Sequence, residues 1–230
     1  MTDSVVLLPG LLCDQRLFAG QLPALVARAP TAVADLTGAD TIAGLAAQVL
    51  ETAPARFALA GLSMGGYVAF EIVRRAPERV TRLALLDTQA RADSATASAR
   101  RHQLMALAEQ GSFRGVTPRL LPMFIHPDRL QDAELCATVQ AMAEDTGKEG
   151  FLRQQTAILG RPDSRPGLPA IACPTLILAG RDDAVTPPKL QLEMATLIPD
   201  ATLVLIPRCG HLAPLERPEA VTRQLLAWLD

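Results

Sequence analysis

Short apolar runs of strand length alternate with helix-like segments along most of this chain, and this alternation constrains the fold more than any other feature. The runs are rich in valine, isoleucine and leucine, and several end in turn-forming residues. Strands that alternate with helices form βαβ units, whose parallel sheet is covered by helices on both faces. The pattern therefore predicts an α/β fold with a mostly parallel sheet. The predicted strands lie at residues 4–10, 31–36, 56–62, 80–88, 173–183 and 201–207.

Four segments between or after these runs have the apolar spacing of helices. In the segment at 40–54, Asp40 is the predicted N-cap, and Pro54 is predicted to end the helix. The segment at 187–199 begins with proline, which suits the first turn of a helix. The other two predicted helices lie at residues 66–77 and 217–230.

Residues 92–170 break the alternation, because they are helix-like and contain no strong strand pattern. Two proline-rich pieces, "VTPRLLPMFIHP" and "GRPDSRPGLPAI", are expected to divide this stretch into segments. An insertion here would cover the carboxyl edge of the sheet, where open α/β folds bind ligands. We therefore predict a core of residues 1–91 and 171–230 and a helical cap of residues 92–170.

Length and charge exclude several classes of protein. A chain of 230 residues suits one domain with an insertion. Its formal net charge of -2 and the lack of a basic cluster argue against nucleic-acid binding, and an aromatic content of 3% argues against base stacking. No apolar stretch reaches the roughly 20 residues that span a bilayer. The start "MTDSVVLLPGLL" has no basic residue before its apolar run, unlike a signal peptide. We expect a cytoplasmic protein.

The four cysteines are widely scattered, with no C-x-x-C pair and no tight cluster with histidine. This spacing argues against a disulfide framework and against structural zinc. We expect free, mostly buried thiols, with neither a metal nor a cofactor in the protein. The cysteines are Cys13, Cys136, Cys173 and Cys209.

Gly61-Leu62-Ser63-Met64-Gly65 lies between a predicted strand and a predicted helix, the position of a nucleophile elbow. The sharp turn presses the residues two before and two after the serine against the strand and helix, which leaves no room for Cβ atoms. A random order of this composition would produce the pattern only ~0.03 times per chain. We predict that Ser63 is a nucleophile.

A nucleophilic serine needs a base, and the chain has three histidines. His102 lies in the charged segment "ARRHQLM" and is expected to face solvent. His126, in "FIHPD", is expected to have a turn or capping role. His211 lies on a glycine-containing loop after the last predicted strand, where a base can reach a serine at the same sheet edge. We therefore predict His211 as the base.

The base needs an acid to orient it, and three aspartates follow predicted strands. Asp182 and Asp183 end the strand "LILAG", and Asp87 ends the strand "LALL". Asp183 is favoured, with Asp182 and Asp87 left as alternatives. The order serine, acid, histidine is that of the α/β-hydrolases.

The segments "LLPGLL", "AGLSMGG", "LAGRDDAVTP" and "CGHLAPLERPEAV" occur in this order. With them the chain resembles the α/β-hydrolase fold family of serine hydrolases over almost its full length. The resemblance implies that the acid three residues past the glycine, Asp183, completes the triad, and that residues 92–170 occupy the place of the family's cap. Because the chain starts almost directly at the first predicted strand, the leading hairpin is expected to be absent or trimmed, leaving a shortened N-terminal sheet edge.

The resemblance also implies an oxyanion hole made of two backbone N–H groups. One belongs to the residue after the nucleophile, here Met64, and the other to a loop after an early strand, here at Leu11. The family loop often reads His-Gly, whereas this chain has Pro9-Gly10. Since the donor is a backbone N–H group, the histidine is not required for it.

The implied activity is hydrolysis of an ester, or a related acyl bond, of a small-molecule substrate by a carboxylesterase-like enzyme. Enol-lactonases and carbon–carbon bond hydrolases share such sites, and a non-catalytic binding protein on the same fold is a further alternative. Nothing in the sequence indicates the oligomeric state.

Residues of the predicted insertion bear on the substrate. Arg161 and Arg165 could meet an acidic group of the substrate, but salt bridges at the surface or within a loop are expected, since arginine is usually exposed. A short apolar stretch could line an acyl pocket or pack in the core. Its residues are Leu121, Met123, Phe124 and Ile125.

Overall fold

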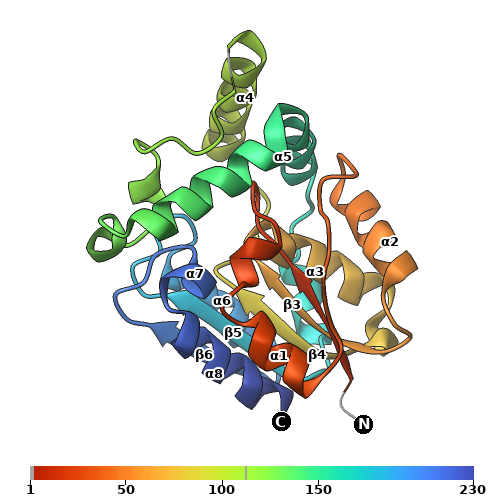
Figure 1. The fold of residues 1–230 in the computed structure, drawn as a ribbon. Coiled ribbons are helices and arrows are strands. Elements are labelled where there is room, and N and C mark those ends of the chain that lie inside the picture. The colour runs from red at the N-terminus through yellow and green to blue at the C-terminus, as the bar shows by residue number, and fades with distance from the viewer. Residues whose placement is uncertain (1–2, 112) are drawn as a thin grey trace.

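The computed structural model describes residues 3–111 and 113–230, which contain one six-stranded sheet (Figure 1). The strands run in the order β2-β1-β3-β4-β5-β6, and every neighbouring pair is parallel. The predicted α/β fold is confirmed, and its N-terminal edge ends at a strand of three residues, β2. The strands are β1 (Ser4–Leu8), β2 (Thr31–Val33), β3 (Phe57–Leu62), β4 (Val80–Leu86), β5 (Thr175–Gly180) and β6 (Ala201–Ile206).

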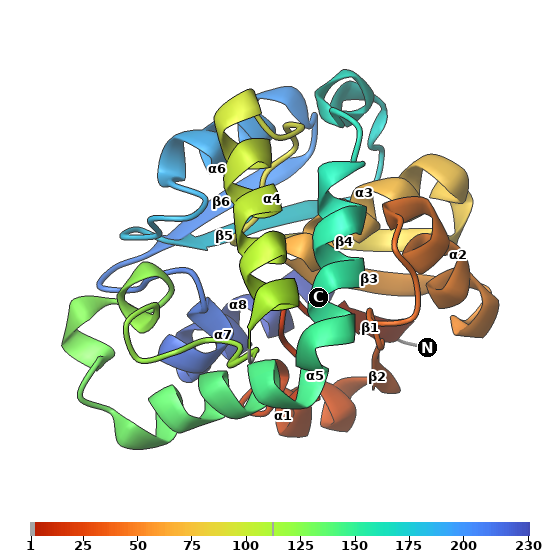
Figure 2. The same cartoon turned by 90° about the horizontal axis from the view of Figure 1, so that it is seen from above.

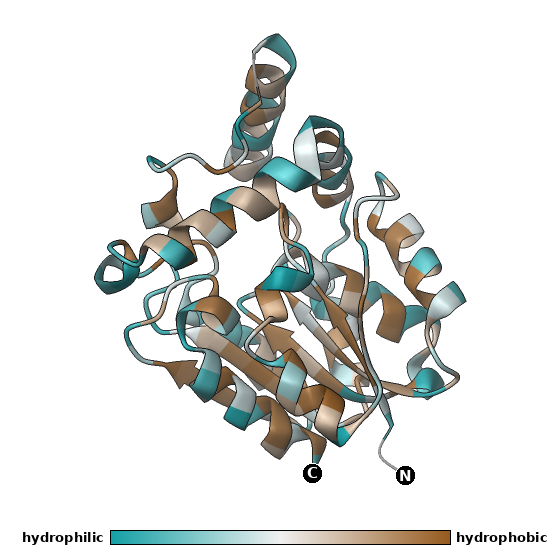
Figure 3. Cartoon of the chain, in the orientation of Figure 1, coloured by the Kyte–Doolittle hydropathy of each residue, from teal (hydrophilic) through white to brown (hydrophobic). Residues whose placement is uncertain are grey.

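The two faces of the sheet form separate hydrophobic clusters because neighbouring residues of a strand point to opposite sides. In β1, Val5 and Leu7 belong to one cluster, and Val6 and Leu8 belong to the other. Figure 3 shows the hydrophobic colour concentrated on the strands and on the helix faces that meet them. The first face is covered by α1 (Leu22–Arg28) and α8 (Pro218–Leu229), and the second by α2 (Ile42–Thr52), α3 (Met64–Arg75) and α6 (Pro188–Leu197).

The four helices predicted in the core are present, but one predicted cap is wrong. The N-cap of α2 is Thr41, whose Oγ1 accepts a hydrogen bond of 3.0 Å from Gly44 N. The helix begins at Ile42, so Asp40 lies one residue too early to reach the N–H groups of the first turn. Elements without a sequence prediction are α1, α7 (Ala213–Glu216), and the 3-10 helices η1 (Gln15–Phe18), η2 (Pro77–Arg79), η3 (Leu121–Met123), η4 (Pro127–Arg129) and η5 (Arg165–Ala170).

Between β4 and β5 the described residues form helices and no strand. The two long ones are α4 (Ala95–Gln110) and α5 (Ala133–Leu159), and α5 changes direction at Gly147, whose φ of 69° favours glycine. Figures 1 and 2 show both helices lying over the edge of the sheet. Gln154 on α5 bonds to the loop after β1, and Phe124, between the two helices, bonds to the loop after β6, so this region covers the carboxyl ends of the strands. We call this region the cap; its limits at 92–170 stay a prediction.

The four cysteines are free, as expected. Cys13 and Cys209 are buried, and Cys136 and Cys173 are half-buried. Burial, followed by the charge of Asp14, raises the pKa of Cys13 to about 12, so this thiol is not ionised near neutral pH. Within residues 3–111 and 113–230, no helix combines the length and apolar character needed to cross a bilayer.

Candidate active site

Ser63 occupies a sharp turn of one residue between β3 and α3. Its backbone has φ 52° and ψ -112°, a conformation that costs a non-glycine residue about 1–3 kcal/mol and that clusters at functional sites. A Cβ atom on Gly61 would lie 2.4 Å from the carbonyl oxygen of Gly65, and one on Gly65 would lie 2.1 Å from that of Leu8. The turn therefore requires glycine at both flanking positions.

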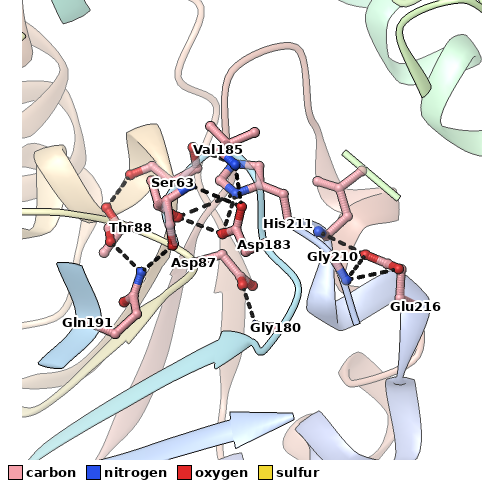
Figure 4. Close-up of polar contacts among 12 residues, drawn as sticks. Ser63, Asp87, Thr88, Gly180, Asp183, Val185, Gln191, Gly210, His211 and Glu216 are labelled. Carbon is pink, nitrogen blue, oxygen red and sulfur yellow. Dashed lines mark hydrogen bonds and ion pairs between the residues drawn. The ribbon is translucent and has the colours of Figure 1, made fainter. Parts of the chain in front are cut away.

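His211 connects Ser63 to Asp183 by two hydrogen bonds (Figure 4). Its Nε2 lies 2.9 Å from Ser63 Oγ, and its Nδ1 lies 2.8 Å from Asp183 Oδ2. The three residues follow β3, β5 and β6, and the carboxyl ends of these parallel strands share one sheet edge. His211 and Asp183 are 4% and 3% exposed, whereas Ser63 is half-buried. Ser63 is thus the most accessible of the three hydrogen-bonded residues.

The carboxylate of Asp183 is held by its own loop. Its Oδ1 accepts hydrogen bonds from the backbone N–H groups of Val185 and Thr186, and its Oδ2 accepts one of 2.6 Å from Thr186 Oγ1. Burial alone would raise the pKa of Asp183, but the charge of His211 and the hydrogen bonds from His211 and Thr186 outweigh it and lower the pKa. An ionised Asp183 favours a proton on Nδ1 of His211, which leaves Nε2 free to accept from Ser63.

The two alternative acids do not bond to His211. The side chain of Asp182 is 46% exposed, and its Oδ2 lies 3.6 Å from Nε2 of His126. Asp87 is fully buried; its Oδ1 accepts from Gly180 N at 2.8 Å, and its Oδ2 has no partner among the described residues. Burial, then the charge of Asp183, raises the pKa of Asp87 well above its ordinary value. Burial thus disfavours the ionised form of Asp87, and no hydrogen bond joins it to His211.

The model of the alpha/beta hydrolase family matches residues 5–224. The chain belongs to this family. Its fold matches a thermophilic esterase from Thermogutta terrifontis with a TM-score of 0.88 and 30% identity, over 98% of this chain and 89% of the esterase. It also matches the enol-lactonase from Burkholderia xenovorans with a TM-score of 0.85 and 26% identity, over 100% of this chain and 92% of that one.

A curated relative from Burkholderia vietnamiensis is named as a 2-hydroxy-6-oxononadienedioate/2-hydroxy-6-oxononatrienedioate hydrolase. It is 30% identical over 198 residues, which is 83% of this chain and 68% of the relative. The names of these proteins give different substrates or activities, so membership of the family does not select one substrate.

The two N–H groups that the family resemblance assigns to the oxyanion hole lie on elements that meet Ser63. Met64 is the first residue of α3, so its N–H has no acceptor within the helix. Leu11 follows Gly10, and a Cβ atom on Gly10 would lie 3.5 Å from the Cβ of Ser63. We define the oxyanion loop as residues 9–13. Among hydrogen bonds between the described residues, neither N–H group donates one, and their role stays a prediction.

The histidine loop, which we define as residues 207–212, is held by a buried residue that the sequence interpretation missed. The carboxylate of Glu216 accepts hydrogen bonds from the backbone N–H groups of Gly210, Leu212 and His126, of which the last, at 2.7 Å, belongs to the cap. Burial raises the pKa of Glu216, although these hydrogen bonds oppose the shift. The signal in the sequence was an acid within the apolar segment "HLAPLE", five residues after His211.

The turn at Ser63 and the loop that carries Asp183 are also joined by hydrogen bonds through Thr88 and Gln191. Thr88 Oγ1 donates to the carbonyl oxygen of Ser63 at 2.7 Å (Figure 4). The buried Gln191 donates through Nε2 to the carbonyl oxygens of Thr88 and Thr186. These bonds fix the backbone of Ser63 relative to the loop that carries Asp183.

The other two histidines lie as expected. His102 is exposed on α4. His126 caps η4, where its Nδ1 accepts from Asp128 N at 3.1 Å. Within the described parts of the chain, no group of three or more histidine, cysteine, aspartate or glutamate side chains could hold a metal ion.

Arg161 forms an ion pair in a loop, as expected, but the expectation that it is exposed is wrong. Arg161 is 5% exposed, forms an ion pair of 2.7 Å with Asp93, and lies over the ring of Tyr67, 4.3 Å from its centroid. The acid and the ring offset the cost of burying the charge. Arg161 and Tyr67 line a cavity of about 890 Å³ whose lining residues include none of the triad. The partly exposed Arg165 pairs with Asp163 and Glu193, as expected of a surface arginine.

The apolar stretch in the cap contributes both to the hydrophobic core and to the surroundings of His211. Leu121 and Ile125 are buried in the hydrophobic cluster, whereas Met123 and Phe124 are half-buried. The ring centroid of Phe124 lies 6.3 Å from that of His211, and the Phe124 carbonyl oxygen accepts from His211 N at 2.8 Å. Phe124 therefore contacts His211 through both its ring and its backbone.

Proposed function

We propose that this protein is a serine hydrolase that cleaves a carboxylic ester, or a related acyl bond, of a small to medium substrate through an acyl-enzyme on Ser63. The observation that carries the proposal is the unbroken hydrogen-bond chain from Ser63 Oγ through His211 to Asp183. A serine hydroxyl is a weak nucleophile until a base removes its proton, and that base must itself be oriented. Here each requirement has a residue within hydrogen-bond distance.

In the first half-reaction, His211 Nε2 takes the proton of Ser63 as Oγ forms a bond to the acyl carbon. The carbonyl electron pair moves to its oxygen, where the N–H groups of Leu11 and Met64 stabilise the negative charge. Asp183 stays ionised and stabilises the imidazolium. The tetrahedral intermediate then expels the alkoxide, which receives the proton from His211 and leaves as the alcohol.

In the second half-reaction, a water molecule replaces the alcohol. His211 removes a proton from this water as its oxygen attacks the acyl-enzyme. The bond between the acyl carbon and Ser63 Oγ then breaks, the serine regains its proton from His211, and the carboxylic acid leaves. Every atom of the two products comes from the ester and the water.

The proposal is tested by labelling with a fluorophosphonate and by turnover of p-nitrophenyl acetate, butyrate and octanoate. Ser63→Ala should lose the label and lower kcat by about 10⁶-fold, as for loss of a serine nucleophile elsewhere. Ser164→Ala, in the lining of the separate cavity, is the matched control and should keep both. Undiminished labelling of Ser63→Ala would refute the assignment, and a folded wild-type protein that neither labels nor turns over would favour a binding role.

A second candidate is an enol-lactonase, favoured by the structural match to the enzyme from Burkholderia xenovorans. A lactone is a cyclic ester, so the same steps open it and leave the departing oxygen on the product. Adding lactones to the ester panel separates the two, because a kcat/KM for a lactone well above that for every open ester would assign the lactone class.

Cleavage of a carbon–carbon bond in an acidic substrate has less support. The relative from Burkholderia vietnamiensis acts, by its name, on a dicarboxylate. In this chain the two cap arginines considered for such a group are paired, Arg161 with Asp93 and Arg165 with Asp163. We therefore place an uncharged acyl substrate first.

A further inference from the structure

The cap contributes a buried side chain to the oxyanion loop. Gln154, on α5, has no exposed surface. Its Oε1 accepts a hydrogen bond of 3.0 Å from Leu12 N, and its Nε2 donates one of 3.1 Å to the carbonyl oxygen of Leu36. Leu12 lies after β1 and Leu36 after β2, so one side chain joins two loops at the carboxyl edge of the sheet.

Leu12 needs such support because its backbone is strained. Its φ is 59°, in the left-handed region that non-glycine residues rarely adopt and that persists only where the surroundings hold it. Leu12 is 8% exposed, and without Gln154 its N–H group would be buried with no acceptor among the described residues. A buried N–H without an acceptor is unfavourable, so loss of Gln154 would favour rotation of this peptide toward another acceptor.

The peptide group between Leu11 and Leu12 is held at both ends. Its N–H belongs to Leu12 and donates to Gln154, and its carbonyl oxygen belongs to Leu11 and accepts from Cys13 Sγ at 3.5 Å. The preceding peptide, which carries the Leu11 N–H, is joined to this one only through φ and ψ of Leu11, so holding the second peptide narrows the directions open to the first. The hydrogen bond to Gln154 therefore constrains the donor that the proposed reaction uses.

We infer that Gln154 is a positioning residue: from the cap, it orients the oxyanion loop so that the Leu11 N–H faces the developing oxyanion. This inference rests on the proposed function, since an oxyanion forms only if Ser63 attacks a carbonyl. Loss of an oxyanion donor costs about 10²–10³-fold in kcat, and a donor that is present but misdirected should cost less.

The neighbouring residue provides a matched control. Gln155 is also a buried glutamine on α5, 1% exposed, but its Oε1 accepts from Arg101 Nη1 at 2.8 Å, a partner on α4. Replacing either glutamine by methionine removes a buried amide from the same turn of α5 and keeps the length of the side chain. Only the change at Gln154 removes a contact with the oxyanion loop.

The experiment measures kcat and KM for p-nitrophenyl butyrate and the Ki of a trifluoromethyl ketone, which forms a tetrahedral adduct with the serine. Gln154→Met should lower kcat about tenfold, with KM within about twofold, and raise Ki by the factor lost from kcat/KM. Gln155→Met should change each value by less than about twofold. Equal effects of the two variants, or a change in KM alone, would overturn the positioning role.

A third variant separates positioning from stability. Gln154→Glu keeps an oxygen that can accept from Leu12 N, but it places a second acceptor against the carbonyl oxygen of Leu36. The variant should therefore melt at a lower temperature than the wild type. Its kcat should stay within about threefold of the wild-type value. A kcat that follows melting temperature across the three variants would overturn the inference.

Fluorophosphonate labelling of the wild type is measured first. If the wild type is not labelled, the proposed function and this inference are both contradicted. If it is labelled but Gln154→Met has the kcat and Ki of the wild type, this inference alone is contradicted.

Discussion

The histidine loop and the oxyanion loop meet at Ser63 but are held in different ways. The histidine loop is held by Glu216, which lies a few residues further along the chain and binds the N–H groups on both sides of His211. Within the oxyanion loop Cys13 bonds to Gly10 and Leu11, but Gln154, which binds the Leu12 N–H from outside the loop, comes from the cap. One loop is thus supported locally, whereas the other depends on a segment far away in the sequence.

The cap touches both loops, but with different atoms. At the histidine loop it offers backbone groups, the carbonyl oxygen of Phe124 to His211 N and the N–H of His126 to Glu216. At the oxyanion loop it offers the side chain of Gln154. Backbone contacts survive most substitutions in the cap, whereas a side-chain contact is lost with one. The oxyanion loop is therefore the part of the site that is more sensitive to changes in the cap sequence.

The largest expected effect on the histidine side comes from Asp183→Asn. The N–H groups of Val185 and Thr186 hold one side-chain oxygen, so the amide nitrogen would face His211 Nδ1 and drive the proton to Nε2. His211 could then no longer accept the proton of Ser63, and kcat should fall by about 10⁴-fold. Steady-state turnover of p-nitrophenyl butyrate, together with the labelling rate, measures this loss. A decrease of less than about tenfold would remove Asp183 from the triad.

Glu216→Gln tests whether the local support of the histidine loop is needed. The carboxylate uses both oxygens to accept from three N–H groups, whereas the amide has one acceptor and would turn a donor toward them. The loop should shift, and kcat should fall about 10- to 100-fold, because misplacement of a catalytic group costs about this much. Activity measured beside a thermal melt checks this expectation.

Glu71→Gln is the control for that variant. Glu71 is also buried, but it pairs with Arg74 and Arg75 on α3 and, among the described residues, forms no side-chain hydrogen bond with either loop. Its kcat should stay within about twofold of wild type. If both variants lose the same activity, Glu216 has no special part in placing His211.

The smallest effect on turnover is expected for Asp87→Asn, since Asp87 does not bond to His211. Its kcat should stay within about twofold. Its stability, however, should depend on pH. Because the folded pKa of Asp87 is raised, the wild type loses stability as pH rises from the unfolded value near 3.9 through the folded pKa. The variant lacks this group, so its stability relative to the wild type should increase with pH and then level off.

Urea unfolding at several pH values between 4 and 8 measures that difference. Other groups with raised pKa values, such as Glu216, are present in both proteins, so their contribution cancels to first order. A difference that does not vary with pH would mean that Asp87 titrates normally. A loss of activity as large as that of Asp183→Asn would instead make Asp87 the triad acid.

Most features that depend on residues close together in the sequence were predicted correctly. The glycines at 61 and 65 are required by the backbone of one turn, and the strands follow from short apolar runs, so the elbow at Ser63 was visible. Parallel strands place their carboxyl ends on one edge, and this topology pointed to His211 and to aspartates after strands. The sequence alone determined the α/β fold, the candidate nucleophile and the candidate base.

Tertiary structure decided what lies next to each buried polar group. Asp182 and Asp183 are neighbours in the chain, yet one is half-exposed beside His126 and the other is buried beside His211. The burial of Arg161 against Asp93, and the contact of Gln154 with Leu12, depend on residues far apart in the chain. A buried polar side chain needs a partner, and the partner is set by how the cap packs on the core, which no local pattern of residues encodes.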